Sequence, residues 1–226
     1  MHPLINGLRG QLIVSCQAYP GEPLRHPESM AQMAESAVTG GAVAIRAQGL
    51  ADISAITGRV DVPVIGLWKS GHDGVFITPT LRHARAVLDA GAQIVALDGT
   101  RRPRPDGRTL ADTVAALRTS HPDSFVMADC GSLDDAKAAS DAGVDVLGTT
   151  LAGYTDERPR TEGPDLDLVA DISQALPLIP LIAEGRVHTP GQAAAALAAG
   201  AHAVVVGTAI THPTTITGWF VEALHH

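Results

Sequence analysis

A short apolar run preceded by a glycine recurs along the chain. Copies stand at residues 40–46, 89–98, 141–148 and 199–207. In each copy the glycine follows a helix-like segment, and glycine readily adopts the left-handed conformation that ends a helix. The runs lack clean polar and apolar alternation, as expected for parallel strands that are covered on both faces. The repeat therefore predicts helices that alternate with buried parallel strands.

Further apolar runs complete a set of eight predicted strands. We expect strands near residues 12–17, 42–46, 63–68, 93–98, 125–129, 145–149, 180–184 and 203–207. Helical patterns fall between or after them, near residues 28–39, 50–58, 81–90, 109–119, 133–142, 165–175, 190–199 and 213–224. This order favours one α/β domain over residues 1–226, a closed (β/α)8 TIM barrel. An open doubly wound sheet is the alternative, but the Gly-x-Gly-x-x-Gly that would favour it is absent after the first strand.

Composition narrows the classes of function. The formal net charge is −8 and aromatic residues make up 3%, which argues against a nucleic-acid partner. No apolar run approaches the ~18 residues of a membrane span, and no secretory signal is recognisable, so we expect a cytoplasmic protein without a membrane partner. Cys16 and Cys130 fall on strands far apart around the barrel, which predicts two free thiols.

Polar residues follow nearly every predicted strand. A charged group at the end of a buried strand is costly unless it is paired or hydrated at a cavity mouth. In a TIM barrel these strand ends share one face, where active sites lie. The residues concerned are Gln17, Arg46, Lys69, Asp98, Asp129, Thr149, Thr150, Glu184, Arg186, Gly207 and Thr208.

Lys69 and Glu184 are the candidate catalytic residues. A partly desolvated lysine at a strand end can act as a base or form a Schiff base, whereas the plainer interpretation is a lysine in an ion pair at the barrel rim. Glu184 lies four strands away, and its plainer role is a partner for a basic residue such as Arg186. A lysine and a glutamate that face one small cavity suit proton abstraction next to a carbonyl.

Other strand-end residues suggest how a ligand is held. Gln17 suits a ligand hydroxyl or amide, and Arg46 suits a carboxylate, a phosphate or a neighbouring acid. Asp98 and Asp129 could each be catalytic, although orienting another side chain is the expected role for at least one. The histidines are scattered and none is placed for a barrel metal site, so we expect no metal.

Glycines mark the ends of the last two strands. Gly185 with Arg186, and Gly207 with Thr208, follow strands seven and eight, where many barrels bind phosphate. Backbone N–H groups reach an anion most easily where no side chain intervenes. These positions predict a phosphorylated ligand.

With these residues in place, the chain resembles the N-acetylmannosamine-6-phosphate 2-epimerase family. The matching segments are residues 12–18, 44–49, 77–80, 96–100, 149–155 and 184–186. The resemblance implies a barrel that interconverts N-acetylmannosamine 6-phosphate and N-acetylglucosamine 6-phosphate in bacterial amino-sugar and sialic-acid catabolism, without metal or organic cofactor. It also implies that Lys69 and Glu184 are catalytic and that Gln17, Arg46, Asp129 and Tyr154 contact substrate.

The chain departs from the family pattern at several positions. The family often carries an arginine where His212 stands, and a histidine is a weaker, pH-dependent partner for phosphate. The loop over residues 70–75 looks shorter than usual, and residues 130–132 also differ. Trp219 and Phe220 on the last helix could cap the barrel or seal a homodimer, which the resemblance favours.

Two other functions remain open. A Schiff-base aldolase or a thiazole-synthase-like barrel would also use a lysine at a strand end. A phosphosugar-binding regulator on the same barrel would need no catalysis, but binding alone does not require both Lys69 and Glu184.

Overall fold

A closed barrel of parallel strands forms the centre of the computed structural model, which describes residues 2–225. The strands are β1 (Leu12–Cys16), β2 (Ala44–Gln48), β3 (Val64–Leu67), β4 (Ile94–Asp98), β5 (Phe125–Asp129), β6 (Val146–Gly148), β7 (Leu181–Glu184) and β8 (Ala203–Val206). Each pairs with its sequence neighbours, and β8 pairs with β1. The predicted TIM barrel is confirmed.

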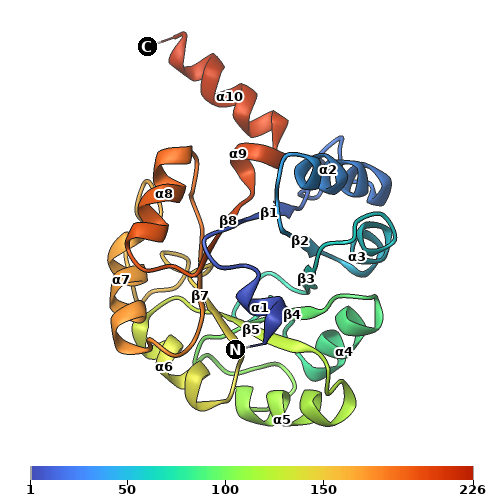
Figure 1. Ribbon diagram of the computed structural model, residues 1–226, viewed down its shortest axis with the longest axis vertical. Helices are drawn as coiled ribbons and strands as arrows, with labels where there is room; N and C mark the ends of the chain where they lie inside the picture. The colour runs from blue at the N-terminus through green and yellow to red at the C-terminus, as the bar shows by residue number, and fades with distance from the viewer. Residues whose placement is uncertain (1, 226) are drawn as a thin grey trace.

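Helices surround the barrel (Figure 1). They are α1 (Pro3–Asn6), α2 (Pro27–Thr39), α3 (Leu50–Thr57), α4 (Leu81–Asp89), α5 (Leu110–Ser120), α6 (Leu133–Asp141), α7 (Leu166–Ala175), α8 (Pro190–Ala198), α9 (Thr208–Thr211) and α10 (Pro213–Ala223). The short helices α1 and α9 were not predicted. No helix within residues 2–225 combines the length and the apolar character that a membrane crossing needs.

Strand alternation divides the apolar residues into two clusters. One cluster lies between strands and helices and includes Ile45, Val95 and Leu147. The other lies inside the barrel and includes Ile13 and Ile65. Successive strand residues point to opposite faces, so each strand contributes to both clusters. The inner cluster forms the floor beneath the charged side chains at the carboxyl ends of the strands.

Helix α1 closes the opposite end of the barrel. Ile5 and Leu8 are buried and join the inner apolar cluster. His202 Nε2 lies 2.8 Å from the Ile5 carbonyl oxygen, and the Gly10 N–H donates to the His202 carbonyl. The barrel is therefore closed at its amino end and open at the end where the candidate residues gather.

The second strand was predicted two residues too early. Residues 42–46 were expected, but β2 runs from Ala44 to Gln48. The Ala42 N–H donates to the Ala37 carbonyl at the end of α2, so Ala42 completes the helix instead of pairing in the sheet. Arg46 consequently lies in the middle of its strand, inside the barrel, and not at its end.

Helix α10 extends away from the barrel (Figure 1). None of its residues is buried, and the exposed fraction is 70% for Phe220 and 83% for Leu224, which directly follows the helix. Trp219 packs against His188, with ring centroids 4.7 Å apart. The helix therefore does not cap the barrel.

Gly66 allows helix α4 to approach the sheet. A Cβ atom at Gly66 would lie 2.7 Å from both the Val87 Cγ1 and the Ala92 Cβ atoms.

We predict that Gly66→Ala lowers the free energy of unfolding by about 1–3 kcal/mol, the usual cost of overpacking a core. Urea denaturation measures the change. The control is Gly191→Ala, where the nearest atom lies 3.9 Å from the new Cβ. Equal stability of the two variants would contradict this packing argument.

Candidate active site

Three charged side chains point into the carboxyl end of the barrel from different strands. On β2, β5 and β7 an inward apolar residue is followed two positions later by Arg46, Asp129 or Glu184. The period of two in a strand places both members of each pair on the same face. The barrel therefore brings together charges that are far apart in the sequence.

Arg46 connects these charges. Its Nη1 and Nη2 atoms donate to the two carboxylate oxygens of Asp129, at 3.1 and 2.6 Å. Nη1 also lies 3.2 Å from Glu184 Oε2, an ion-pair contact without hydrogen-bond geometry. Arg46 and Asp129 are 1% and 0% exposed, so both charges are removed from water. Such burial is tolerated only with close pairing.

The carboxyl group of Glu184 has a raised pKa. Burial raises the pKa of its carboxyl to about 7; the positive charge of Arg46 opposes this rise, and the negative charge of Asp129 adds to it. Glu184 Oε2 is buried and accepts no hydrogen bond from the described residues. A carboxyl group of this kind can donate or accept a proton at neutral pH.

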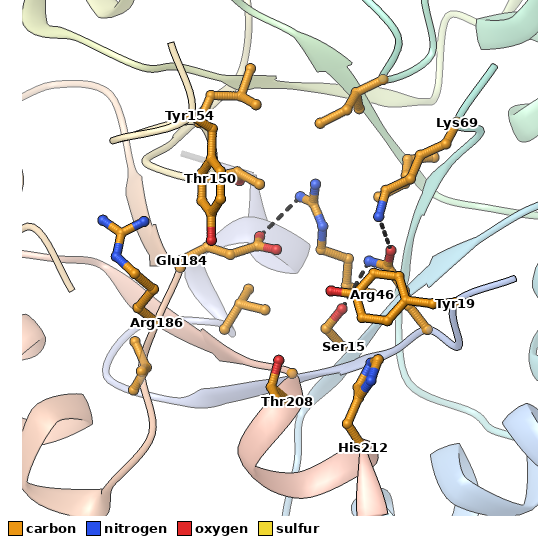
Figure 2. Close-up of a pocket in the computed structure, with 18 of the residues that line it drawn as sticks. Ser15, Tyr19, Arg46, Lys69, Thr150, Tyr154, Glu184, Arg186, Thr208 and His212 are labelled. Carbon is orange, nitrogen blue, oxygen red and sulfur yellow. Dashed lines mark hydrogen bonds and ion pairs between the residues drawn. The ribbon is translucent and has the colours of Figure 1, made fainter. Parts of the chain in front are cut away.

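Lys69 stands across the cavity from Glu184 (Figure 2). Its Nζ donates to Gln17 Oε1 at 2.9 Å, and Gln17 Nε2 donates to Ser15 Oγ at 2.9 Å. Much of the side chain is open at the cavity mouth, but desolvation by the surrounding walls lowers the pKa of its ammonium group, and Arg46 lowers it further. A lowered pKa favours the neutral amine, which can act as a base.

These residues surround a cavity of about 270 Å³. The residues that the sequence assigned to catalysis, substrate or phosphate all line it, except Asp98 and Asp129. The carboxylate of Asp129 lies beneath the cavity surface, where Arg46 and Thr150 Oγ1 donate to it. Its oxygens hold Arg46 in place, and its expected contact with substrate stays a prediction. The roles expected for the other residues stay predictions.

Two loops form one end of the cavity. Gly207 precedes α9, whose first N–H groups have no partner within the helix. Gly185 and Arg186 both have positive φ angles, 110° and 55°, and form a tight turn after Glu184. Thr208 and His212 complete this end. Backbone N–H groups and small residues here could accommodate an anion.

Arg186 also holds a neighbouring loop. Its guanidinium donates to the carbonyl oxygens of Gly163 and Ala152, at 3.1 and 2.8 Å, and to Thr161 Oγ1 at 3.0 Å. All three acceptors are neutral, so these hydrogen bonds do not neutralise its positive charge. The Tyr154 ring centroid lies 5.3 Å from the guanidinium carbon.

Sequence reasoning missed several residues of the cavity wall. Ser15 and Tyr19 flank Gln17 at steps of two, which is the alternation that could have identified them. Thr150 was noted at a strand end without a role. Asp98 is buried and does not line the cavity, because Thr100 and Arg102 donate to its carboxylate.

The described residues offer neither a cluster of metal-binding side chains nor a reactive cysteine. No group of three His, Cys, Asp or Glu side chains within residues 2–225 is arranged to hold a metal. Cys16 and Cys130 are free and buried, and burial raises the pKa of the Cys16 thiol to about 12. A thiol with so high a pKa is a poor nucleophile.

Comparisons with known proteins agree with the geometry. Residues 30–226 match the family NanE, described as "Putative N-acetylmannosamine-6-phosphate epimerase". A relative from Cutibacterium acnes, named "Putative N-acetylmannosamine-6-phosphate 2-epimerase", is 62% identical over 98% of this chain and 96% of its own. One of the same name from Caldanaerobacter subterraneus is 47% identical over 96% and 92%. The solved N-acetylmannosamine-6-phosphate 2-epimerase from Clostridium perfringens has a TM-score of 0.93 and 38% identity, over 98% and 96% of the two chains.

The charge of Asp129 can be tested through the titration of Glu184. We predict that Asp129→Asn lowers the pKa of Glu184 below about 7, because the variant removes a nearby negative charge and frees Arg46 to pair with Glu184. Carbon-13 NMR of the carboxyl groups follows the titration. Asp98→Asn is the matched control, since Asp98 is the register partner of Asp129 but its carboxylate is bonded by Thr100 and Arg102 and not by Arg46. An unchanged or raised pKa in Asp129→Asn would overturn this assignment.

Proposed function

The chain belongs to the N-acetylmannosamine-6-phosphate 2-epimerase family, and we propose that Lys69 and Glu184 carry out its reaction as a proton-transfer pair. The reaction interconverts N-acetylmannosamine 6-phosphate and N-acetylglucosamine 6-phosphate. The two sugars differ only in the configuration at C2. In the open-chain form C2 lies next to the C1 aldehyde, so removal of its proton gives an enolate. Return of a proton to the other face inverts C2.

Lys69 is the base that removes the C2 proton in this proposal. A base must be unprotonated, and the desolvation that lowers the pKa of Lys69 favours the neutral amine. The hydrogen bond to Gln17 Oε1 fixes the position of Nζ. Gln17 is therefore both a positioning residue and a candidate contact for a sugar hydroxyl or the acetamido group.

Glu184 supplies a proton from the opposite side. Its pKa of about 7 leaves a substantial protonated fraction at neutral pH, as an acid needs. Lys69 follows β3 and Glu184 ends β7, on opposite sides of the barrel. A planar enolate between them would present one face to each residue. The single observation that carries the proposal is this opposition of two groups whose pKa values are both shifted toward neutrality.

Arg46 stabilises the intermediate. Its guanidinium lies beside Glu184, where the negative charge of an enolate oxygen would develop. A fixed positive charge in a site that excludes water stabilises such an oxygen strongly. Arg46 Nε is buried without a hydrogen-bond partner among the described residues, and Asp129 keeps the guanidinium in place.

The substrate phosphate binds at the end of the cavity formed by the loops after β7 and β8. Gly185 and Gly207 allow a close approach to the backbone, and Thr208 offers its hydroxyl. Arg186 adds positive charge from beside the Tyr154 ring. We place the enzyme in the cytoplasm, in amino-sugar and sialic-acid catabolism, where two buried free thiols fit a reducing compartment.

Loss of the Lys69 amine tests the base. We predict that Lys69→Ala lowers the rate at which the C2 proton of N-acetylmannosamine 6-phosphate exchanges in D₂O by roughly 10²- to 10⁴-fold, the usual contribution of a general base. Proton NMR follows both exchange and epimerisation. Lys137→Ala is the control, because Lys137 is the chain's other lysine and lies exposed on α6.

Three results would count against the proposal. Full activity in Lys69→Ala would remove that residue from the mechanism. Binding of the sugar phosphate by the native chain without exchange would favour a regulator. Borohydride trapping of a carbonyl substrate on Lys69 would favour a Schiff-base enzyme.

We further propose a homodimer that buries helix α10. Phe220 and Val221 on this helix and Leu224 at its end are exposed, and α10 packs mainly against α9. An apolar helix that its own chain leaves uncovered is typical of a protein interface.

Sedimentation velocity tests this assembly. We predict that the native chain sediments as a dimer and that the double variant Phe220→Glu, Leu224→Glu sediments as a monomer, because buried carboxylates oppose association. Leu178→Glu is the matched control on a loop far from α10, since Leu178 is 91% exposed. A native monomer, or equal dissociation of the control, would rule out α10 as the interface.

A further inference from the structure

Glu22 connects two residues at the phosphate end of the cavity. His212 is 4% exposed, and its Nδ1 lies 3.3 Å from Glu22 Oε1. The other carboxylate oxygen of Glu22 accepts a hydrogen bond from the Tyr19 N–H at 2.6 Å. The rings of Tyr19 and His212 pack together, with centroids 4.7 Å apart. One carboxylate on the loop after β1 thus orders both an aromatic wall and an imidazole.

The geometry leaves one nitrogen of His212 for a ligand. Nδ1 is buried and has no hydrogen-bond partner among the described residues, so the Glu22 carboxylate is the charged group that faces it. The imidazole lines the cavity beside Thr208 (Figure 2). Because the two ring nitrogens lie on different sides of the ring, Nε2 is the atom available to a group bound there.

The nearby ammonium group of Lys69 contacts Tyr19 and Gln17, not the Glu22 carboxylate. Lys69 lies on the Tyr19 ring, with Nζ 5.8 Å from its centroid, and its ammonium donates to Gln17. The contacts of the Glu22 carboxylate within residues 2–225 are the Tyr19 N–H and His212. The Glu22 carboxylate therefore contacts the residues at this end of the cavity, Tyr19 and His212.

We propose that Glu22 is a positioning residue: its carboxylate faces Nδ1 of His212 and orients the ring, so that Nε2 is presented to the substrate phosphate. This inference rests on the proposed function. A carboxylate beside one imidazole nitrogen fixes the orientation of the ring and so directs the other nitrogen at a ligand. The pair would take the place of an arginine at this position.

The alternative is that Glu22 only repels the phosphate. Its negative charge lies close to the anion site, and by itself that charge would weaken binding. The two roles predict opposite signs for the same substitution. The sign depends on the residue at position 212, since an arginine there has no imidazole for Glu22 to orient.

A double-mutant cycle decides between them. The variants are Glu22→Gln, His212→Arg and the pair combined, with KM and kcat measured for N-acetylmannosamine 6-phosphate. In the native background Glu22→Gln should raise KM roughly three- to tenfold, the equivalent of one hydrogen bond, with the loss on KM and not on kcat. In the His212→Arg background it should leave KM unchanged or lower it. Glu28→Gln, which removes the same charge from α2, is the control.

Two outcomes would overturn the proposal. A lower KM for Glu22→Gln in the native background would make Glu22 a repelling charge only. An equal rise in both backgrounds would assign Glu22 to loop structure and not to the orientation of His212. Binding of inorganic phosphate, measured by calorimetry, repeats the cycle without catalysis. It therefore separates a failure of this inference from a failure of the epimerase proposal.

Discussion

The site depends on one guanidinium, that of Arg46, placed between two carboxylates inside the barrel. Asp129 accepts a hydrogen bond from each of its two terminal nitrogens, and Glu184 lies at ion-pair distance. One positive charge cannot neutralise two negative charges in a region from which water is excluded. Burial raises the pKa of the less well bonded carboxyl group, Glu184, to about 7, and the negative charge of Asp129 adds to this rise. Burial and charge count together thus produce a group suited to proton transfer.

The barrel supports the buried charges of Arg46, Asp129 and Glu184 from below and from the sides. Apolar side chains of the inner cluster, such as Met127 and Ile182, lie one layer below the charges and keep water from entering underneath. Helix α1 seals the far end. The strands are held on both sides by hydrogen bonds to their neighbours, so the positions of the three charged residues are set by the sheet and not by flexible loops. The loops add the anion end and the aromatic walls.

The sequence was sufficient to predict much of this arrangement. A repeated unit of helix, glycine and apolar strand predicts the barrel, and the residues after its strands predict Lys69 and Glu184. The depth of Arg46 could not be predicted, because Ala42 completes a helix and shifts β2 along the chain. The strand-end position of Asp129 suggested that it could orient another side chain, but it did not reveal that this side chain is Arg46, because the two residues are 83 positions apart in the sequence.

Contacts between residues far apart in the sequence were the other feature that could not be predicted. Glu22 and His212 are 190 positions apart, and only the closure of β8 onto β1 brings their loops together. The sequence could not predict that α10 is exposed. The apolar pattern of a helix is the same whether its own barrel or a second copy of the chain covers it.

The central claim is that Lys69 and Glu184 act on opposite faces of the same carbon. The most direct measurement is a single turnover, in ordinary water, of N-acetylmannosamine 6-phosphate that carries deuterium at C2. If one residue removes the deuteron and the other donates a proton from the opposite side, the product carries protium at C2. Retention of deuterium at C2 in the epimerised product would show that one group carries the same hydrogen between the two faces, and would contradict this account.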